Sequence, residues 1–292
     1  MGADLSEARC PLVTIGIPSY NSARFIEQAV DSALAQTYRQ LEVLVIDDVS
    51  EDETWSSLLG FSDPRLRILR NDANLGAVGN WNRVLAEAQG EFIKVLHADD
   101  FIEPEAIEAL VVSSAEDSAI VLASSRRWIV NEGGCRMGTR GARWPRGRID
   151  GRQAVQDMAR TGRNLIGEPS ATLMRTEAAR RVGGFDSKAG YCVDLDLWTR
   201  MLVQGDLYFC DTPLASYRVS RGQWSVELAA RQSADFRHLL TRLQEEPKFD
   251  VSKSDAHRGA RAAARQAILR RILYVLLPKG TRKQSAESPS RP

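Results

Sequence analysis

Residues 12–48, LVTIGIPSYNSARFIEQAVDSALAQTYRQLEVLVIDD, contain the clearest structural pattern of the sequence. This segment begins with an apolar run that ends at Pro18, and it closes with a second apolar run that ends in two aspartates. Between the two runs, apolar residues recur at the spacing of a helix: Phe25, Ile26, Val30 and Leu34. A strand, a helix and a strand in this order predict two parallel strands joined by a crossover helix.

The same alternation continues downstream. Apolar runs predict further strands at residues 65–69, 91–96 and 119–124, and helical patterns occupy residues 76–89 and 104–115. Strands that alternate with helices predict an α/β fold with a mostly parallel, Rossmann-like sheet covered by helices on both faces. In such sheets, ligands bind outside the carboxyl ends of the strands.

Composition is that of an ordinary soluble protein, with 43% apolar and 26% charged residues in a chain of 292. There is no run of eighteen apolar residues, and residues 1–10 lack the apolar core of a signal peptide, so we expect a cytoplasmic protein. Four scattered cysteines without a C-x-x-C pair predict free thiols, and they argue against a zinc site or a disulfide framework.

Charge is small in total but unevenly distributed. Residues 253–292 hold ten Lys/Arg against two Asp/Glu, a net +8, so the first 252 residues carry −7 of the total +1. A second basic stretch, residues 126–152, holds eight arginines against Glu132 and Asp150. Such stretches indicate either an anionic partner or a solvated charged face. We expect no nucleic-acid partner.

Polar residues follow three of the predicted strands: PSYN at 18–21, DDVSED at 47–52 and HADD at 97–100. Since the carboxyl ends of parallel strands share one edge, these residues are expected on a common rim with at least four carboxylates. Like charges repel, so the cluster predicts a bound cation or a hydrogen-bonded ligand. For either aspartate of the DD pair, capping of the next helix is the alternative.

Two nucleotide-binding motifs are absent. The segment GIPSYNSA does not match the dinucleotide fingerprint G-x-G-x-x-G, and no phosphate loop of the Walker type occurs. A receiver domain of two-component signalling also uses acidic pairs at strand ends. It is an alternative for residues 10–130, but it leaves the rest of the chain unexplained.

Three segments together resemble one known family. They are VTIGIPSYNSARFIEQAVDSALAQTYRQLEVLVIDDVSEDET (13–54), NDANLGAVGNWNRVLAEAQGEFIKVLHADDFIEP (71–104) and EPSATLMRTEAARRVGGFDSKAGYCVDLDLWTRMLVQGDLYFCDTPLASYRVS (168–220). In order and spacing they are similar to the inverting glycosyltransferases of family 2, which have the GT-A fold. The resemblance covers roughly residues 11–220.

The resemblance implies a division of the chain. Residues 1–225 form the GT-A catalytic domain, in which 10–125 bind the nucleotide sugar and 126–225 form the acceptor side with the catalytic base. Residues 226–280 are expected to form basic C-terminal helices, and residues 281–292 a disordered tail.

The resemblance also implies a nucleotide pocket. Its residues are Pro18, Tyr20, Asn21, Asp48, Asn74, Gly76, His97 and Ala98. Tyr20 is expected near the base, and Asp48 is expected to accept a hydrogen bond from a uracil or thymine ring. Asp47 would then only support the loop.

Catalytic roles are implied in the same way. Asp99 is expected to hold Mn²⁺ or Mg²⁺ on the sugar diphosphate, because hard cations prefer carboxylate oxygens. Asp194 is expected to act as the general base that takes the proton of the acceptor hydroxyl. The acceptor side would include Glu168, Ser170 and Trp198. For Trp198, packing in the core is an equal alternative.

The chain departs from the family pattern at three positions. His97 replaces the first aspartate of the D-x-D metal motif. Val193 replaces the glutamate before the base. Ser220 replaces a histidine after the YR motif, for which Arg218, Arg221 or Trp224 are candidate substitutes. A catalytically inactive protein that binds nucleotide sugars, or a scaffold, is therefore the alternative function.

The expected activity is metal-dependent transfer, with inversion, from a UDP- or dTDP-sugar to a hydroxyl of a saccharide or lipid-linked acceptor in bacterial surface polysaccharide or glycolipid synthesis. Near the end of the chain, the apolar segment 267–280 is flanked by basic residues. It predicts a helix on an anionic membrane at the inner face of the cell membrane, a helix packed on the domain, or a homodimer contact.

Overall fold

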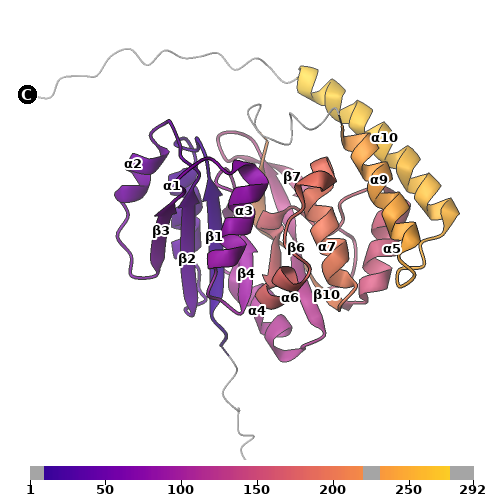
Figure 1. The fold of residues 1–292 in the computed structure, drawn as a ribbon, viewed down its shortest axis with the longest axis horizontal. Helices are drawn as coiled ribbons and strands as arrows, with labels where there is room; N and C mark the ends of the chain where they lie inside the picture. Colours follow the sequence, from indigo (N-terminus) through magenta and orange to yellow (C-terminus); the bar gives the residue numbers. More distant parts are fainter. Residues whose placement is uncertain (1–9, 220–230, 277–292) are drawn as a thin grey trace, which may run out of the picture.

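The computed structural model describes residues 10–219 and 231–276, with side chains described as far as Ile268. Its strands form a ten-stranded sheet in the order β3-β2-β1-β4-β9-β6-β10-β5, with β7 paired to β6 and β8 paired to β10 (Figure 1). The strands are β1 Val13–Ser19, β2 Leu41–Asp47, β3 Leu66–Arg70, β4 Phe92–Val95, β5 Phe101–Ile102, β6 Ile120–Val130, β7 Arg136–Arg140, β8 Gly147–Ile149, β9 Thr172–Arg175 and β10 Asp206–Arg218.

The described helices surround this sheet. They are α1 Ile26–Leu34, α2 Thr54–Leu59, α3 Gly76–Glu87, α4 Ala106–Glu116, α5 Gly151–Thr161, α6 Thr176–Arg181, α7 Val193–Leu202, α9 Gln232–Glu245 and α10 Lys253–Leu276. Two short 3₁₀ helices are also present, η1 Pro169–Ala171 and η2 Ser187–Cys192.

The first half of the chain has the predicted parallel arrangement. β3, β2, β1 and β4 are parallel neighbours. Alternate side chains of β2 enter opposite cores, because successive residues of a strand face opposite sides of the sheet. Val43 and Val45 pack with α1 and α2, whereas Leu44 and Ile46 pack with α3. The α/β fold with helices on both faces is therefore confirmed.

The second half of the sheet is mixed, a detail that the sequence did not reveal. β9 is inserted antiparallel between β4 and β6, so β6 runs parallel to β4 without touching it. β10 runs parallel to β6 for most of its length, and β5, β7 and β8 pair antiparallel at the margins.

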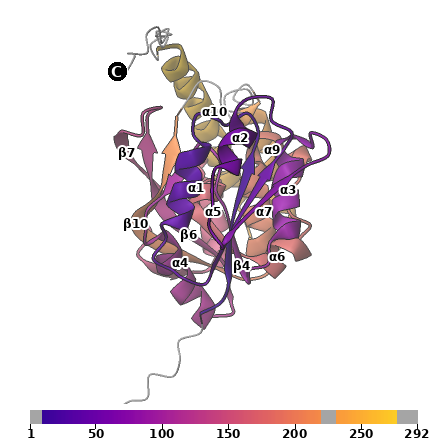
Figure 2. The same cartoon turned by 90° about the vertical axis from the view of Figure 1, so that its left-hand side faces the viewer.

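The helices form layers (Figures 1 and 2). Residues of α1, α2 and α4 share one core with the sheet, and residues of α3, α5, α6 and α7 share the other. The C-terminal helices lie outside this second layer: α9 packs against η2, and α10 packs on α5 and α9.

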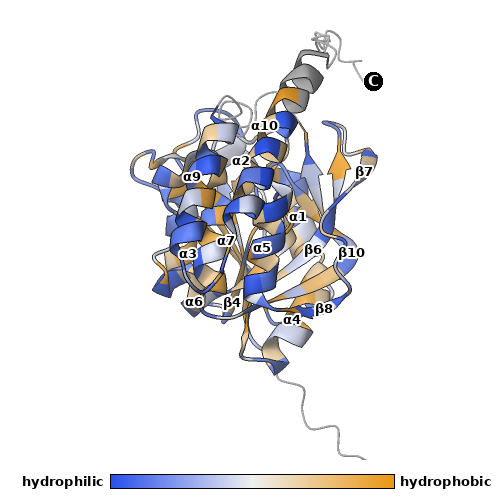
Figure 3. Cartoon of the chain, turned by 90° about the vertical axis from the view of Figure 1, so that its right-hand side faces the viewer, coloured by the Kyte–Doolittle hydropathy of each residue, from blue (hydrophilic) through white to orange (hydrophobic). Residues whose placement is uncertain are grey.

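Helix α10 packs tightly along its first half. At Gly259, an added Cβ would lie 1.8 Å from the carbonyl oxygen of Ala159 on α5, so only glycine permits this approach. The opposite face exposes Arg258, Arg261 and Arg265, and it is hydrophilic in Figure 3. Packing on the domain is thus observed for the part of α10 before the apolar segment.

Two other expectations can be compared directly with the structure. The four cysteines form no disulfide with one another; two are exposed and two are buried. Within residues 10–219 and 231–276, no helix has the length and apolarity needed to cross a bilayer.

Candidate active site

The predicted rim exists. In the parallel register, Ser19 at the end of β1 lies opposite Asp47 at the end of β2, and Gly16 lies opposite Val95 at the end of β4. Tyr20, Asp48 and the segment 97–100 therefore emerge at one edge of the sheet, because the parallel strands that precede them end there.

The two aspartates after β2 have different surroundings. Asp48 is 1% exposed, and its Oδ1 accepts hydrogen bonds from Asn71 Nδ2 at 2.6 Å and from the Leu75 amide at 2.8 Å. Asn74 Nδ2 donates to the Asp48 carbonyl at 3.0 Å, which ties the loop before α3 to the end of β2. Asp47 instead pairs with Arg70 and accepts from the Ser50 amide, so it supports its own loop.

The other residues predicted for the nucleotide pocket lie at different depths in the structure. Pro18 and Ala98 are buried, while Tyr20 is 47% exposed. Asn21 has a φ of +46°, and its amide group fixes the loop after β2 by accepting from the Glu51 amide at 2.9 Å. Gly76 opens α3 with a φ of +73° and faces open space, so the backbone there is free for close approach.

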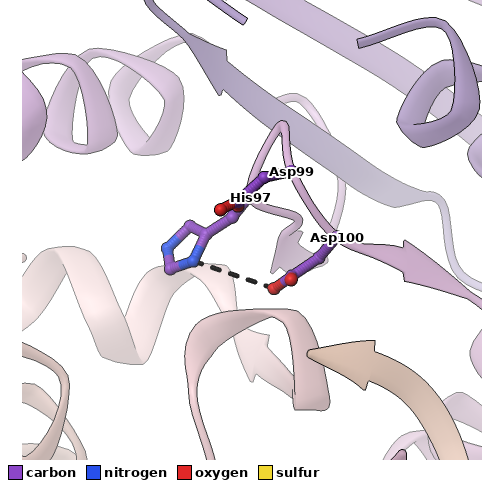
Figure 4. Close-up of side chains that lie close together, drawn as sticks. All are labelled: His97, Asp99 and Asp100. Atoms are coloured by element: carbon purple, nitrogen blue, oxygen red, sulfur yellow. Dashed lines mark ion pairs between the residues drawn. The ribbon is translucent and has the colours of Figure 1, made fainter. Parts of the chain in front are cut away.

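The HADD segment forms a compact cluster (Figure 4). Ligand-type atoms of His97, Asp99 and Asp100 all lie within 4.8 Å of one another. Asp100 is 1% exposed; its Oδ2 accepts from Ser170 Oγ at 2.6 Å, and its Oδ1 accepts from the Arg218 amide at 2.9 Å. The His97 amide donates to Ser170 Oγ at 3.1 Å. Ser170 thus holds two members of the cluster together.

Histidine 97 fits a role as a neutral ligand. Burial lowers its pKa, although Asp99 and Glu168 act in the opposite direction. Burial likewise raises the pKa of Asp100, reinforced by the charge of Asp99. The Nε2 atom of His97 is buried, and no partner for it exists among the described residues. A buried ring nitrogen without a partner is costly unless a ligand or ion completes it.

An aromatic row runs from this cluster to the helix that carries the predicted base. The His97 ring stacks on Trp81 with centroids 4.9 Å apart, and Trp81 meets the edge of Phe185 at 5.2 Å. Phe185 in turn meets Trp198 of α7 at 6.3 Å. Packed aromatic side chains therefore connect the HADD segment with helix α7, which carries Asp194.

Asp194 lies in the first turn of α7. Its Oδ2 accepts from Asn164 Nδ2 at 2.9 Å, and its Oδ1 accepts from the Leu195 amide at 2.7 Å. Burial, together with the nearby charge of Glu168, raises the pKa of Asp194 from 3.8 to about 7. A carboxylate with this pKa suits general-base chemistry at neutral pH.

The three predicted acceptor-side residues differ in their access. Glu168 is partly exposed and pairs with Arg127, whose Nε lies 2.5 Å from Glu168 Oε2. Although burial alone favours the neutral acid, this guanidinium holds the pKa of Glu168 below its usual value. Ser170 is buried within the Asp100 cluster. Trp198 is fully buried and donates to the Gly167 carbonyl at 3.0 Å, so its position is that of core packing rather than of a wall touching the acceptor.

The positions that depart from the family pattern are only partly visible. Val193 is buried in the core. Ser220, Arg221 and Trp224 lie outside the described residues. Arg218 is described: its Nε donates to the Asp99 carbonyl at 2.6 Å, and its Cζ lies 4.4 Å from the ring centroid of Phe25 and 5.6 Å from that of Phe101.

Three neighbours of the site were not predicted from the sequence: Trp81, Arg127 and Asn164. Trp81 and Asn164 belong to no recognisable motif, whereas Arg127 lies in the basic stretch 126–152. Two surface cavities, of 260 and 350 Å³, are lined by Arg200 and Arg242 and by no residue of the rim.

The mixed sheet, with acidic residues at the carboxyl ends of its parallel strands, is the arrangement expected of a glycosyltransferase with the GT-A fold. The family model described as glycosyl transferase family 2 matches residues 14–183, more than half of the chain, and the protein belongs to this family. Asp194 and the C-terminal helices lie beyond the matched segment.

Similar proteins come from several bacteria. An uncharacterized protein of Mycobacterium tuberculosis is 31% identical over 248 residues, which cover 81% of this chain and 77% of that one. A UDP-Glc:alpha-D-GlcNAc-diphosphoundecaprenol beta-1,3-glucosyltransferase of Escherichia coli is 45% identical over 89 residues, 30% of this chain and 35% of that one. Chondroitin synthase of Pasteurella multocida is 36% identical over 139 residues, but these are only 14% of its length.

Solved structures with low identity share the fold. S. aureus TarS 1-349 in complex with UDP-GlcNAc has a TM-score of 0.62 at 17% identity, covering 85% of this chain and 69% of that one. The mannosyltransferase PcManGT from Pyrobaculum calidifontis, in complex with GDP-Man and Mn²⁺, has a TM-score of 0.64 at 18% identity, covering 93% and 82%.

Proposed function

We propose that the protein is a metal-dependent inverting glycosyltransferase. It transfers a sugar from a UDP- or dTDP-sugar to a hydroxyl of a saccharide or lipid-linked acceptor in bacterial surface polysaccharide or glycolipid synthesis. The observation that carries the proposal is that one site contains both the His97–Asp99–Asp100 cluster and Asp194, whose raised pKa suits a general base. Support for the donor and acceptor classes comes from the names of the Escherichia coli glucosyltransferase and the UDP-GlcNAc complex.

The cluster fits a divalent ion. It offers two carboxylates and an imidazole nitrogen, and the ring nitrogen that faces Asp100 is Nδ1, 4.0 Å from Oδ2. The buried Nε2 of His97, on the other side of the ring (Figure 4), is left for a polar group of the donor. When bound, Mn²⁺ or Mg²⁺ would neutralise the charge that develops on the departing diphosphate. A nitrogen ligand favours Mn²⁺, since Mg²⁺ strongly prefers oxygen.

The protein's own residues supply the rest of the mechanism. Asp194 accepts the proton of the acceptor hydroxyl, whose oxygen forms the new bond to the anomeric carbon as the bond to the diphosphate oxygen breaks. Asn164 and the Leu195 amide fix the carboxylate, so its orientation is set before the acceptor arrives. A single displacement of this kind inverts the anomeric centre.

On the nucleotide side, we propose that Asp48 accepts from the base and that Tyr20, Asn21, Asn74 and Gly76 surround the nucleotide. The support is their common position at the ends of β1 and β2 and the start of α3. The buried carboxylate of Asp48 is already oriented by two donors, which makes it a pre-organised acceptor.

An acceptor with an anionic group fits the charge on the other side. Arg127 of β6 and Arg140 of β7 lie directly opposite each other, so their side chains project from the same face. Glu168 forms an ion pair with Arg127, and the charge of Arg140 also lowers the pKa of Glu168. Within the described residues, Arg140 itself forms no ion pair. One carboxylate between two guanidinium groups leaves a positive charge that a lipid-linked diphosphate could meet.

A position at the inner face of the cell membrane is consistent with the arrangement of α10. In Figures 1 and 2 the chain enters β1 from the bottom, and α10 ends at the top, on the side where the carboxyl ends of the parallel strands lie. The exposed Arg258, Arg261 and Arg265 precede this end and suit an anionic surface. A homodimer contact remains an alternative use of the same helix.

Ligand-dependent unfolding tests the proposal. Melting temperature is measured with UDP-, dTDP- and GDP-sugars, each with and without Mn²⁺, because a ligand that binds only the folded state stabilises it. Stabilisation by a UDP- or dTDP-sugar that requires Mn²⁺, followed by turnover, supports an enzyme. Stabilisation without turnover toward any saccharide or lipid-linked acceptor, or toward water, supports the inactive binding protein.

A further inference from the structure

The segment that carries Asp194 is held from outside the catalytic sheet. Asp194 lies at the start of α7, directly after the 3₁₀ helix η2. Helix α9, which lies beyond the segment matched by the family model, packs along this stretch and contacts it on both sides of Asp194.

The first contact precedes the proposed base. Asp235, in the first turn of α9, accepts a hydrogen bond from the Tyr191 amide, with 2.9 Å between Oδ2 and N. The neighbouring Gly190 has a φ of +58° and a ψ of −124°, and an added Cβ would lie 2.4 Å from Asp235 Oδ2. The chain therefore passes directly over the carboxylate, in a conformation that favours glycine.

The second contact follows the proposed base. Asp196 is fully buried, and Arg242 of α9 lies 2.6 Å from its Oδ1, measured to Nη1. Arg200 of α7 meets the other oxygen at 2.7 Å and also donates to the carbonyls of Val182 and Gly184. A buried carboxylate needs such partners, so Asp196 fixes α7 against α9.

The two contacts belong to one face of α9. Asp235 and Arg242 are seven residues apart, which is two helical turns, and the buried Leu239 lies between them on the same face. Helix α9 therefore binds Tyr191 and Asp196, which lie on either side of Asp194.

We propose that Asp235 and Arg242 are positioning residues that hold the Asp194 carboxylate in its partly buried place at the start of α7. This inference rests on the proposed function, because it takes Asp194 to be the base. Without these two contacts, the start of α7 becomes more mobile, and the Asp194 carboxylate loses its alignment and becomes more exposed to solvent. Misplacement of a catalytic group by about 1 Å costs up to about 100-fold in rate.

Asp235→Ala tests the first contact, and Asp235→Asn is its matched control. The asparagine keeps an oxygen that accepts from the Tyr191 amide but loses the charge in the first turn of α9, as alanine does. We expect Asp235→Ala to lower kcat about 10-fold with an unchanged KM for UDP-sugar, and Asp235→Asn to stay close to wild type.

The pH profile separates positioning from simple loss of stability. A better hydrated Asp194 ionises more easily, so the acidic limb of kcat in Asp235→Ala should move to lower pH. Arg242→Gln should also move the acidic limb of kcat to lower pH. This variant replaces Asp235→Ala in the experiment if Asp235→Ala does not fold. Asp250→Ala removes the exposed ion pair to Arg152, away from the base, and should leave kcat and its profile unchanged.

Three results would overturn the inference: wild-type kcat and pH profile in both Asp235→Ala and Arg242→Gln, losses proportional only to the unfolded fraction, or equal losses in Asp235→Asn and Asp235→Ala. Asp194→Asn is measured alongside. If Asp194→Asn turns over normally, the proposed base is wrong and the inference falls with it. If Asp194→Asn is inactive while the α9 variants behave as wild type, the inference alone is wrong.

Discussion

Replacing Asp194 by asparagine is the most informative single change. The amide keeps the shape of the side chain and can still accept from the Leu195 amide, but it cannot take a proton. General-base assistance contributes about 10²–10⁴-fold, so kcat should fall by at least about 100-fold. The KM for the nucleotide sugar should stay nearly constant, because no donor-side residue changes.

The wild-type pH profile supplies the magnitude that belongs to this residue. With a pKa of about 7, Asp194 is about nine-tenths ionised at pH 8 and about one-tenth ionised at pH 6, so kcat should fall about 10-fold between them. An aspartate with an ordinary pKa near 3.9 would give a flat profile over this range. In Asp194→Asn, the residual rate should lose this acidic limb.

Stability should change in the opposite direction to activity. The unfolded chain ionises Asp194 near pH 4, whereas the folded protein favours the protonated acid up to about pH 7. Ionisation of this group therefore lowers stability as pH rises from about 4 to 7, and asparagine removes the penalty. At pH 8 we expect Asp194→Asn to unfold at a higher temperature, with a gain of about 1–2 kcal/mol, less than the full pKa shift implies because Asp194 is partly exposed to solvent.

The assay measures release of nucleoside diphosphate from UDP-sugar with Mn²⁺, at pH 5.5 to 8.5, beside circular dichroism melts of both proteins. A variant that keeps wild-type kcat at pH 8, or a wild-type kcat that does not change between pH 8 and pH 6, would refute the assignment of the base.

Other predictions concern the cluster and its neighbours. Asp99→Asn should keep the fold and abolish Mn²⁺-dependent turnover, because an amide is a poor ligand for a hard cation; normal turnover in Mn²⁺ contradicts this. His97→Ala should weaken UDP-sugar binding, measured by calorimetry, by about 1–2 kcal/mol, and an unchanged Kd would show another role. His97→Asp should retain Mn²⁺-dependent activity, and an inactive but folded variant counts against donor contact. Glu168→Gln should move the acidic limb of kcat to lower pH, since Glu168 raises the pKa of Asp194; a shift to higher pH would contradict the electrostatic account.

The sequence was sufficient for the parallel half of the fold and for the rim. Buried parallel strands have continuous apolar sequences, and the residues that follow them lie at the same edge of the sheet. Asp48 and the HADD segment were therefore identifiable as neighbours before any coordinates. The roles assigned to Tyr20, Asn21, Asn74 and Gly76 stay predictions, because position alone does not establish contact with a nucleotide.

The mixed half of the sheet could not be predicted in the same way. β9 pairs with β4 and β6 across long sequence separations, and short apolar runs do not reveal which partner a strand takes. For the same reason Ser170 was assigned to the acceptor side, whereas the structure links its hydroxyl to Asp100.

Tertiary contacts also decide between chemically identical residues. Asp194 and Asp196 stand two positions apart on the sequence, and either could be the base. Asp196 is fully buried and neutralised by Arg200 and Arg242, while Asp194 is partly exposed and has no ion pair among the described residues. The partner arginine from α9 lies 46 positions away, so no local pattern marks it.

The stereochemistry of the product distinguishes a single displacement at this site from a mechanism that retains configuration. Wild-type protein is incubated with Mn²⁺ and an α-linked UDP-sugar, with the saccharide or lipid-linked acceptor that supports turnover. The anomeric proton of the new glycosidic bond is then observed by NMR before secondary reactions. Single displacement with Asp194 as the base predicts a β-linked product. An α-linked product would mean that configuration is retained, and it would contradict the mechanism proposed for this site.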